Sequence, residues 1–187
     1  MHKPGVPLVF EDYPLFRPNL TPYEIFKLGS FGGYYFRPIY SSITNKHYKN
    51  VHKEFPWAKS LDPSLLTQPE QIASINRYNV ISGTSLEYWE SKGWIKKQDP
   101  YGWVQWYCRF YAGRRSPDDT RQIKRWLAFA GPNGRFRRHL MNKIKTTKNL
   151  NNKSISPTVR QGLQHWAYIL TKRDFLQYKT KMKSHLS

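Results

Sequence analysis

Four aromatic rings spaced along residues 103–110 define the clearest element of the chain. The stretch WVQWYCRFYAG places rings at positions i, i+3, i+4 and i+7, namely Trp103, Trp106, Tyr107 and Phe110. That spacing puts all four on one side of a helix, which would end at Gly113. Because such rings bury a large apolar area, the sequence predicts that this face is core. We expect the Trp-rich segment 86–110 to form one core shared by both halves of the chain.

The positive charge is concentrated in the second half. Residues 1–93 hold 10 Lys+Arg and 8 Asp+Glu, a net charge of +2, whereas residues 94–187 hold 21 and 4, a net charge of +17. Such an excess repels itself unless salt or an anionic partner screens it. Nucleic acid is a frequent partner of a domain with this footprint. A basic surface that only serves solubility is the alternative.

Start and stop signals predict short helices along most of the chain. Two capping boxes, Thr21-Pro22-Tyr23-Glu24 and Thr84-Ser85-Leu86-Glu87, each precede an apolar run, and Ser116-Pro117 and Ser156-Pro157 combine an N-cap with a proline in the first turn. Glycines, prolines and apolar periodicity supply the other boundaries. The predicted helices cover residues 21–29, 69–79, 84–93, 103–113, 116–131, 133–147, 156–170 and 171–182.

Other segments predict less regular structure. Residues 1–20 hold four prolines and are expected to form an extended arm. Residues 34–40 favour β-structure, so a short strand or hairpin is predicted there. The expected fold is mainly α with a small β element (α+β): an irregular, aromatic-rich N-terminal half and a basic bundle of about five short helices. Residues 21–187 would form a single domain, whose basic helical part spans 84–187.

Basic side chains crowd the predicted helices of the second half. A guanidinium group pairs phosphate oxygens bidentately, and each neutralised phosphate releases counterions. We therefore predict contacts with a nucleic-acid backbone, and the alternative is a set of solvated helix faces with ordinary ion pairs. The candidates are Arg109, Arg114, Arg115, Arg121, Lys124, Arg125, Arg135, Arg137, Arg138, Lys143, Lys145 and Arg160.

Two further groups of residues are candidates for a site. Bases stack on exposed aromatic rings, and Tyr34, Tyr35 and Tyr40, on a predicted strand beside a glycine pair, are the stacking candidates. The catalytic candidates for metal-assisted phosphodiester cleavage are Asp118, Asp119, Glu87 and Glu90. Adjacent acids in the first turn of a helix have a simpler explanation, which is their favourable interaction with the helix dipole.

The sequence contains no recognised zinc or P-loop motif, so no cofactor and no bound metal are predicted. Cys108 is the only cysteine, which excludes an intramolecular disulfide, and in a helix with a buried face it is expected to be an inert apolar residue. No segment approaches the roughly 20 apolar residues of a membrane helix, and the start has no signal-peptide core. We expect an intracellular protein, nuclear or virus-associated, that is neither secreted nor membrane-bound.

Three stretches resemble a family of small basic proteins of algae and large DNA viruses to which no activity is attached. They are GSFGGYYFRPIYSSIT, TSLEYWESKGWI and GWVQWYCRFYAGRRSPDDTRQIKRW. The resemblance covers most of the chain from Gly29 to Leu170. It implies a shared fold and no particular chemistry, so no catalytic residue is carried over from it.

The leading prediction is a nucleic-acid-binding protein whose contacts are directed at the backbone, with DNA slightly favoured over RNA. One alternative is an enzyme that processes nucleic acid, a metal-dependent nuclease or a base-processing enzyme, and it requires the four acids to converge in a cleft. Another is a structural or assembly protein of a virion or ribonucleoprotein, which requires an N-terminal arm without contacts to its own domain.

Overall fold

A computed structural model describes residues 2–147 and 149–184. Within these residues, seven α-helices and one two-stranded antiparallel sheet confirm the mainly α architecture with a small β element. In chain order the elements are α1 (Pro22–Lys27), β1 (Ile39–Ser41), β2 (Lys46–Tyr48), α2 (Leu86–Ser91), α3 (Trp103–Tyr111), α4 (Asp119–Phe129), α5 (Arg135–Thr147), α6 (Pro157–His165) and α7 (Lys172–Ser184). None of the described helices is long and apolar enough to cross a membrane.

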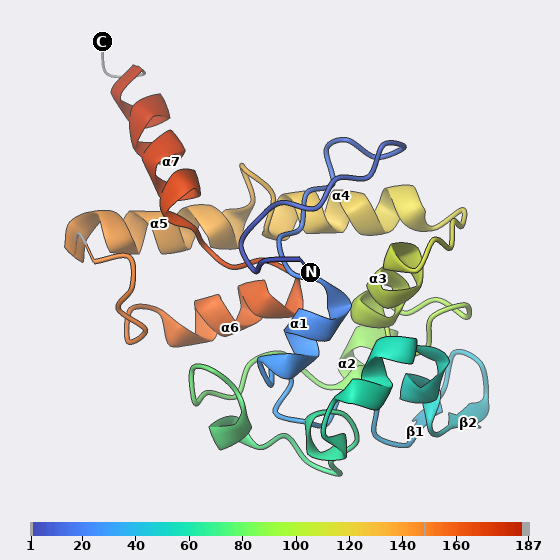
Figure 1. The fold of residues 1–187 in the computed structure, drawn as a ribbon. Coiled ribbons are helices and arrows are strands. Elements are labelled where there is room, and N and C mark those ends of the chain that lie inside the picture. The colour runs from blue at the N-terminus through green and yellow to red at the C-terminus, as the bar shows by residue number, and fades with distance from the viewer. Residues whose placement is uncertain (1, 148, 185–187) are drawn as a thin grey trace.

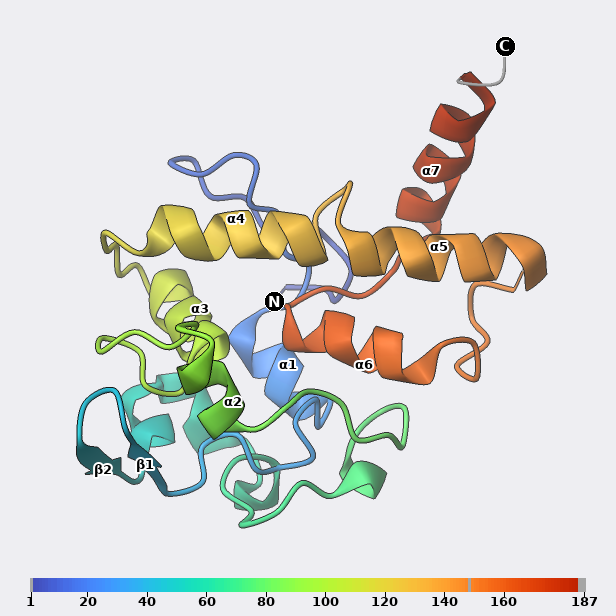
Figure 2. The ribbon, with the colours of Figure 1, turned by 180° about the vertical axis from the view of Figure 1, so that it is seen from behind.

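Helices α4 and α5 run end to end along one side of the molecule (Figure 1). Seen from behind, α3 lies beneath α4 and α6 lies beneath α5 (Figure 2). In both views the N-terminal arm loops over α4 on the side away from α3, and α7 leaves the body at α5.

Some predicted helix starts are confirmed and others are displaced. Helix α1 has the predicted capping box, in which Thr21 Oγ1 accepts from Glu24 N and Glu24 accepts from Thr21 N. The N-cap of α2 lies one residue later than predicted, at Ser85 instead of Thr84. Ser85 Oγ accepts a hydrogen bond from Tyr88 N. Thr84 Oγ1 instead accepts a hydrogen bond from Trp89 Nε1 at 2.6 Å.

The helix predicted over residues 69–79 is wrong, because only a 3-10 turn over Ala73–Ile75 forms there. The buried side chain of Asn76 accepts from the backbone N–H groups of Tyr78 and Val80 and donates to Val80 O. These local bonds replace the helical ones. The predicted strand is also displaced: residues 34–38 form turns, and the hairpin pairs Ile39–Ser41 with Lys46–Tyr48.

Helix α3 is the centre of the core, as its aromatic spacing predicts. The four aromatic side chains of the predicted face are buried, with Trp106, Tyr107 and Phe110 at 0 % exposure, whereas Tyr111 at the end of the helix is exposed. Their rings contact partners from both halves of the chain, including Phe16 of the N-terminal arm, whose ring also meets Trp126 of α4. Cys108 lies in the same core, where burial raises the pKa of its thiol, so the predicted inert apolar role fits its position.

The N-terminal arm is part of the domain rather than a free extension. The Asn19 side chain donates to Ile169 O and accepts from Ile169 N, both at 2.8 Å, and its backbone N–H donates to Ala167 O. Phe16 is fully buried, although its neighbour Leu15 is 73 % exposed. An arm without contacts to its own domain, which the assembly alternative requires, is therefore not what the structure shows.

A buried polar cluster joins the loop after α1 to α6. The Nε2 atoms of Gln161 and His165 both contact Ser30 O, and the His165 imidazole stacks on Phe31 with ring centroids 4.3 Å apart. Burial lowers the pKa of His165 from 6.5 to about 4, against the opposing effect of its hydrogen bond to Ser30. The imidazole is therefore neutral in the folded protein near neutral pH.

Acidification is expected to destabilise the protein through His165. The unfolded chain takes up a proton at this residue as the pH falls below 6.5, whereas the folded chain takes it up only near pH 4. The free energy of unfolding should therefore fall by up to about 3 kcal/mol between these two values. Denaturant titrations across this pH range check it, with His165→Gln as the comparison. A variant with the same pH dependence as the wild type would contradict the assignment to His165.

Candidate nucleic-acid interface

The solvent side of α5 carries four exposed cations. Because α5 follows a helical period, Arg135, Arg138 and Lys145 lie along one stripe, and Lys143 lies at the opposite edge of this side, with His139, Asn142 and Thr146 between. All four side chains are exposed, and no carboxylate among the described residues pairs with them. These four residues are called the α5 basic face. The opposite side of the helix carries Leu140, Met141 and Ile144 into the core.

The sequence around this face explains why its charge is not neutralised. Residues 120–173 contain thirteen Lys and Arg residues and not one Asp or Glu. The stripe from Arg135 to Lys145 is about 15 Å long at the helical rise. That length is enough to meet several phosphates of a nucleic-acid strand, which are spaced 3.4 Å apart along the axis of each strand of a duplex.

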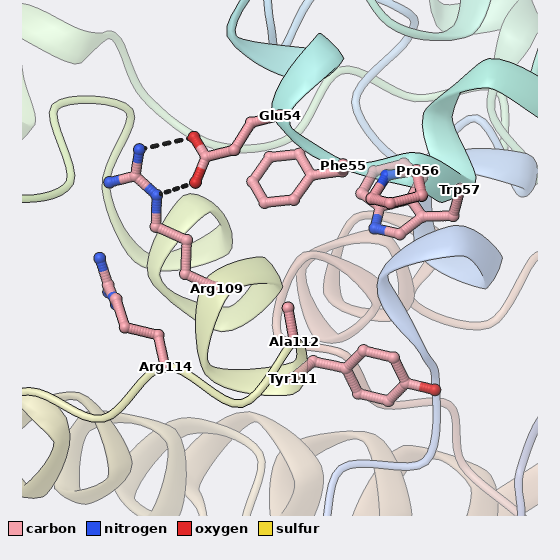
Figure 3. A pocket seen from close by; sticks show the side chains of 8 residues that line it. All are labelled: Glu54, Phe55, Pro56, Trp57, Arg109, Tyr111, Ala112 and Arg114. Carbon is pink, nitrogen blue, oxygen red and sulfur yellow. Dashed lines mark hydrogen bonds and ion pairs between the residues drawn. The ribbon is translucent and has the colours of Figure 1, made fainter.

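Arg109 and Arg114, two predicted contact residues, are held by acids of the protein itself. The carboxylate of Asp99 is 1 % exposed and accepts from Arg109 Nη1 at 3.0 Å and from Arg114 Nη1 and Nη2 at 2.8 and 2.7 Å. Arg109 also makes a bidentate pair with Glu54, at 2.7 Å for both bonds, as Figure 3 shows. No local motif predicts this role for Asp99, because its partners lie 10 and 15 residues away across a turn.

Two other predicted contact residues also have carboxylate partners. Arg115 pairs with Asp12 of the N-terminal arm, 103 residues away, and stacks over Phe110 at 3.9 Å. Arg121 pairs with Asp118 through Nε and Nη2, at 2.5 and 2.8 Å. Both side chains remain partly accessible, but their charge is compensated inside the protein.

Arg137 and Arg160 are buried and have structural roles. Arg137 pairs with Asp174 of α7 at 2.7 Å and lies 4.5 Å from the ring centroid of Tyr168, so it fixes α7 on α5. Arg160 donates to Ile155 O and Leu150 O and holds the linker before α6. Of the predicted cations, five remain exposed without a carboxylate partner in the described residues: Lys124, Arg135, Arg138, Lys143 and Lys145.

The predicted stacking residues are not equivalent. Tyr35 is buried, and its hydroxyl donates to Tyr101 O and accepts from Gln105 N, so it belongs to the core and cannot stack on a base. Tyr34 is half-buried beneath the guanidinium of Arg37, at 4.5 Å. Tyr40 is 51 % exposed on β1, beside His47. The glycine pair before these residues forms turns rather than a strand, which explains the error for Tyr35.

The four predicted catalytic acids do not form a metal site. Asp119 is fully buried and accepts from Trp106 Nε1 at 2.8 Å, whereas Asp118 is paired with Arg121. Glu90 accepts from the hydroxyls of Ser41 and Ser42, and Glu87 is exposed on α2. The described residues contain no group of three or more His, Cys, Asp or Glu that could hold a metal ion. The convergence that the nuclease alternative requires is therefore not found among these residues.

A hollow of about 620 Å³ lies between the C-terminal end of α3 and the turns over residues 51–60 (Figure 3). Phe55, Pro56 and Trp57 line one side, and Tyr111 and Ala112 line the other. The charged groups at its rim, Glu54, Arg109 and Arg114, already pair with one another or with Asp99. The hollow therefore offers an apolar surface without an uncompensated charge, and it differs in character from the α5 basic face.

Comparisons with protein-family models, with curated proteins and with solved structures found no match for this chain. The resemblance to the algal and viral family therefore stays a prediction. The geometry of the described residues is the basis for assigning a function.

Proposed function

We propose that this protein binds nucleic acid and that the α5 basic face is its contact with the phosphate backbone. One observation carries the proposal: four cations lie exposed on the solvent side of one helix, three of them along one stripe, and no carboxylate of the described residues compensates them. A field of one sign at a surface attracts a polyanion and raises its rate of association. Most other arginines of the predicted set pair with carboxylate or carbonyl groups of the protein itself, so fewer residues are free to contact nucleic acid than the composition implies.

The same observation favours backbone contacts over the reading of individual bases. Arginine and lysine side chains on a helix face pair with phosphate oxygens, which carry no sequence information. Lys124 of α4 and the exposed cations Lys172 and Arg173 at the start of α7 extend the positive surface beyond α5. The slight preference for DNA over RNA stays part of the proposal, since phosphates are common to both.

Neutralising the α5 basic face is expected to lower the affinity for nucleic acid and to make that affinity less dependent on salt. In the variant Arg135→Gln, Arg138→Gln, Lys143→Gln and Lys145→Gln, up to four phosphate contacts are lost. Affinity at low salt should fall at least about ten-fold, and the slope of log K against log salt should become shallower by about 3. Anisotropy titrations of a labelled duplex between about 50 and 200 mM salt measure both quantities.

A control with the same loss of charge is available in the N-terminal half. Lys46, Lys49, Lys53 and Lys59 are all exposed, so changing them to glutamine lowers the net charge equally at another place. We expect this control to retain most of the affinity and of the salt slope. Equal losses in the two variants would show that only the overall charge matters. Weak binding of the wild type that does not depend on salt would contradict the proposed function itself.

A further inference from the structure

Two large aromatic side chains, one on α2 and one just after it, lie exposed side by side. Tyr88 is 44 % exposed and Trp94 is 39 % exposed, and their rings meet edge to face with centroids 5.8 Å apart. Large apolar rings at the surface of a protein mark contact sites when they occur together. The pair lies among cations: Lys92 Nζ is 5.4 Å from the Tyr88 ring centroid, and Arg121 Nη2 reaches Trp94 O.

Arg125 of α4 lies between two indole rings in this surface. Its guanidinium is 5.4 Å from the ring centroid of Trp94 and 5.3 Å from that of Trp166, and its Nη1 donates a hydrogen bond to the neutral side chain of Gln122 at 2.9 Å. Burial and the nearby Arg121 lower the pKa of Arg125 to about 10. The Gln122 acceptor is neutral, and the nearby carboxylate of Asp118 only partly offsets the burial and Arg121 effects, so an approaching anion stabilises this partly desolvated cation. The residues Tyr88, Trp94, Arg125 and Trp166 are called the Trp94 platform.

A row of stacked rings connects the Trp94 platform to the α5 basic face. Trp166 stacks on Phe129 with centroids 5.0 Å apart, and Phe129 stacks on Phe136 at 3.9 Å. The exposed guanidinium of Arg135 covers the Phe136 ring at 4.9 Å. Phe129 and Phe136 are only half-buried. Rings and cations therefore form a connected series of contacts from α2 to α5, in which Arg125 and Arg135 lie on either side of three stacked rings.

We propose that the Trp94 platform stacks unpaired nucleobases, so that the protein engages single-stranded segments of nucleic acid. This inference rests on the proposed function and adds a ligand class to it. Base–aromatic stacking tolerates any sequence because every base has a π-face, and arginine planes stack on bases in the same way. Rings and cations that lie next to one another fit a ligand that carries both bases and phosphates.

The chemistry favours unpaired bases over two other occupants. A duplex keeps the faces of its bases inside the stack, where Trp94 cannot reach them without unstacking the helix. A peptide that docks on exposed rings would be an apolar or acidic segment. Such a segment would use the platform without involving the α5 basic face, whereas a nucleic-acid strand uses both.

The test compares labelled oligothymidylate with a duplex of the same length, using the full chain and the variant Trp94→Ala. We expect the affinity for the single strand to fall roughly five- to a hundred-fold, as for the loss of one stacked base. The affinity for the duplex should change less than about two-fold, because its backbone contacts remain. Trp94→Phe keeps a stacking ring and should restore most of the single-strand affinity.

Tyr111→Ala is the matched control, because Tyr111 at the end of α3 is 40 % exposed and lines the apolar hollow rather than the Trp94 platform. We expect it to bind both ligands like the wild type, and a thermal unfolding curve for each variant confirms that it is folded. Unchanged single-strand affinity in Trp94→Ala, or equal losses for both ligands, would overturn the inference while leaving the proposed function in place. A wild type that binds neither ligand in a salt-dependent way would overturn both.

Discussion

Replacing Phe16 with alanine is expected to lower the free energy of unfolding by about 3 to 5 kcal/mol. The ring is fully buried and contacts Trp106, Phe110 and Trp126, at centroid distances of 5.7, 5.5 and 5.2 Å. Its removal leaves a cavity between the N-terminal arm and the helices of the second half, and close-packed aromatic neighbours cannot collapse into such a space. Urea denaturation followed by tryptophan fluorescence measures the loss.

The adjacent residue supplies the control. Leu15 is 73 % exposed, so Leu15→Ala should change the free energy of unfolding by no more than about 0.5 kcal/mol. A similar small effect for Phe16→Ala would mean that the N-terminal arm is not anchored in the core. In that case the requirement of the assembly alternative, an arm free of its own domain, would be met after all.

Asp119→Ala is expected to destabilise the protein by about 3 to 5 kcal/mol. The buried carboxylate accepts from Trp106 Nε1, from Ser116 N and from Ser116 Oγ, at 2.8, 2.8 and 2.7 Å. Alanine would leave these donors without an acceptor beneath the core helix α3. Asp119→Asn retains one carbonyl acceptor and should cost less. Chemical denaturation of the three proteins orders their stabilities.

Glu70→Ala removes an exposed carboxylate and serves as the control, with an expected change within about 0.5 kcal/mol. If Asp119→Ala were as stable as this control, the structural role of Asp119 would be contradicted. The prediction also affects any test of the nuclease alternative. A loss of activity in Asp119→Ala would report unfolding as readily as catalysis, so such an assay needs a measurement of the folded fraction beside it.

The parts of the fold that could be predicted are those encoded by neighbouring residues. The aromatic spacing of Trp103–Phe110 predicted both helix α3 and its burial, because apolar residues at i, i+3, i+4 and i+7 indicate a helix with one buried face. The capping box at Thr21 is equally local. The helix predicted over residues 69–79 failed because one side chain, that of Asn76, takes over the backbone bonds of its neighbours. Propensity does not reveal such competition.

The candidate interface could be predicted only in outline. Composition places the positive charge in the second half, but it does not say which cations are compensated. Arg115 forms an ion pair with Asp12, which is 103 residues away in the sequence, and Arg109 forms one with Glu54, which is 55 residues away. Such partners are set by the tertiary fold, so they have no signature in the local sequence. The uncompensated charge of α5 is easier to predict, because no Asp or Glu lies near this helix in the sequence.

The bond between Asn19 and Ile169 has a consequence for how the chain matures during synthesis. These residues are 150 positions apart, so the backbone of the N-terminal segment lacks this partner until the 150 residues that follow Asn19 have been synthesised. Until then Phe16 has no complete set of neighbours, and the aromatic surface of α3 stays partly uncovered. Growing chains expose apolar surface in just this way before their last contacts close. The nascent protein should therefore depend on chaperones more than its size suggests.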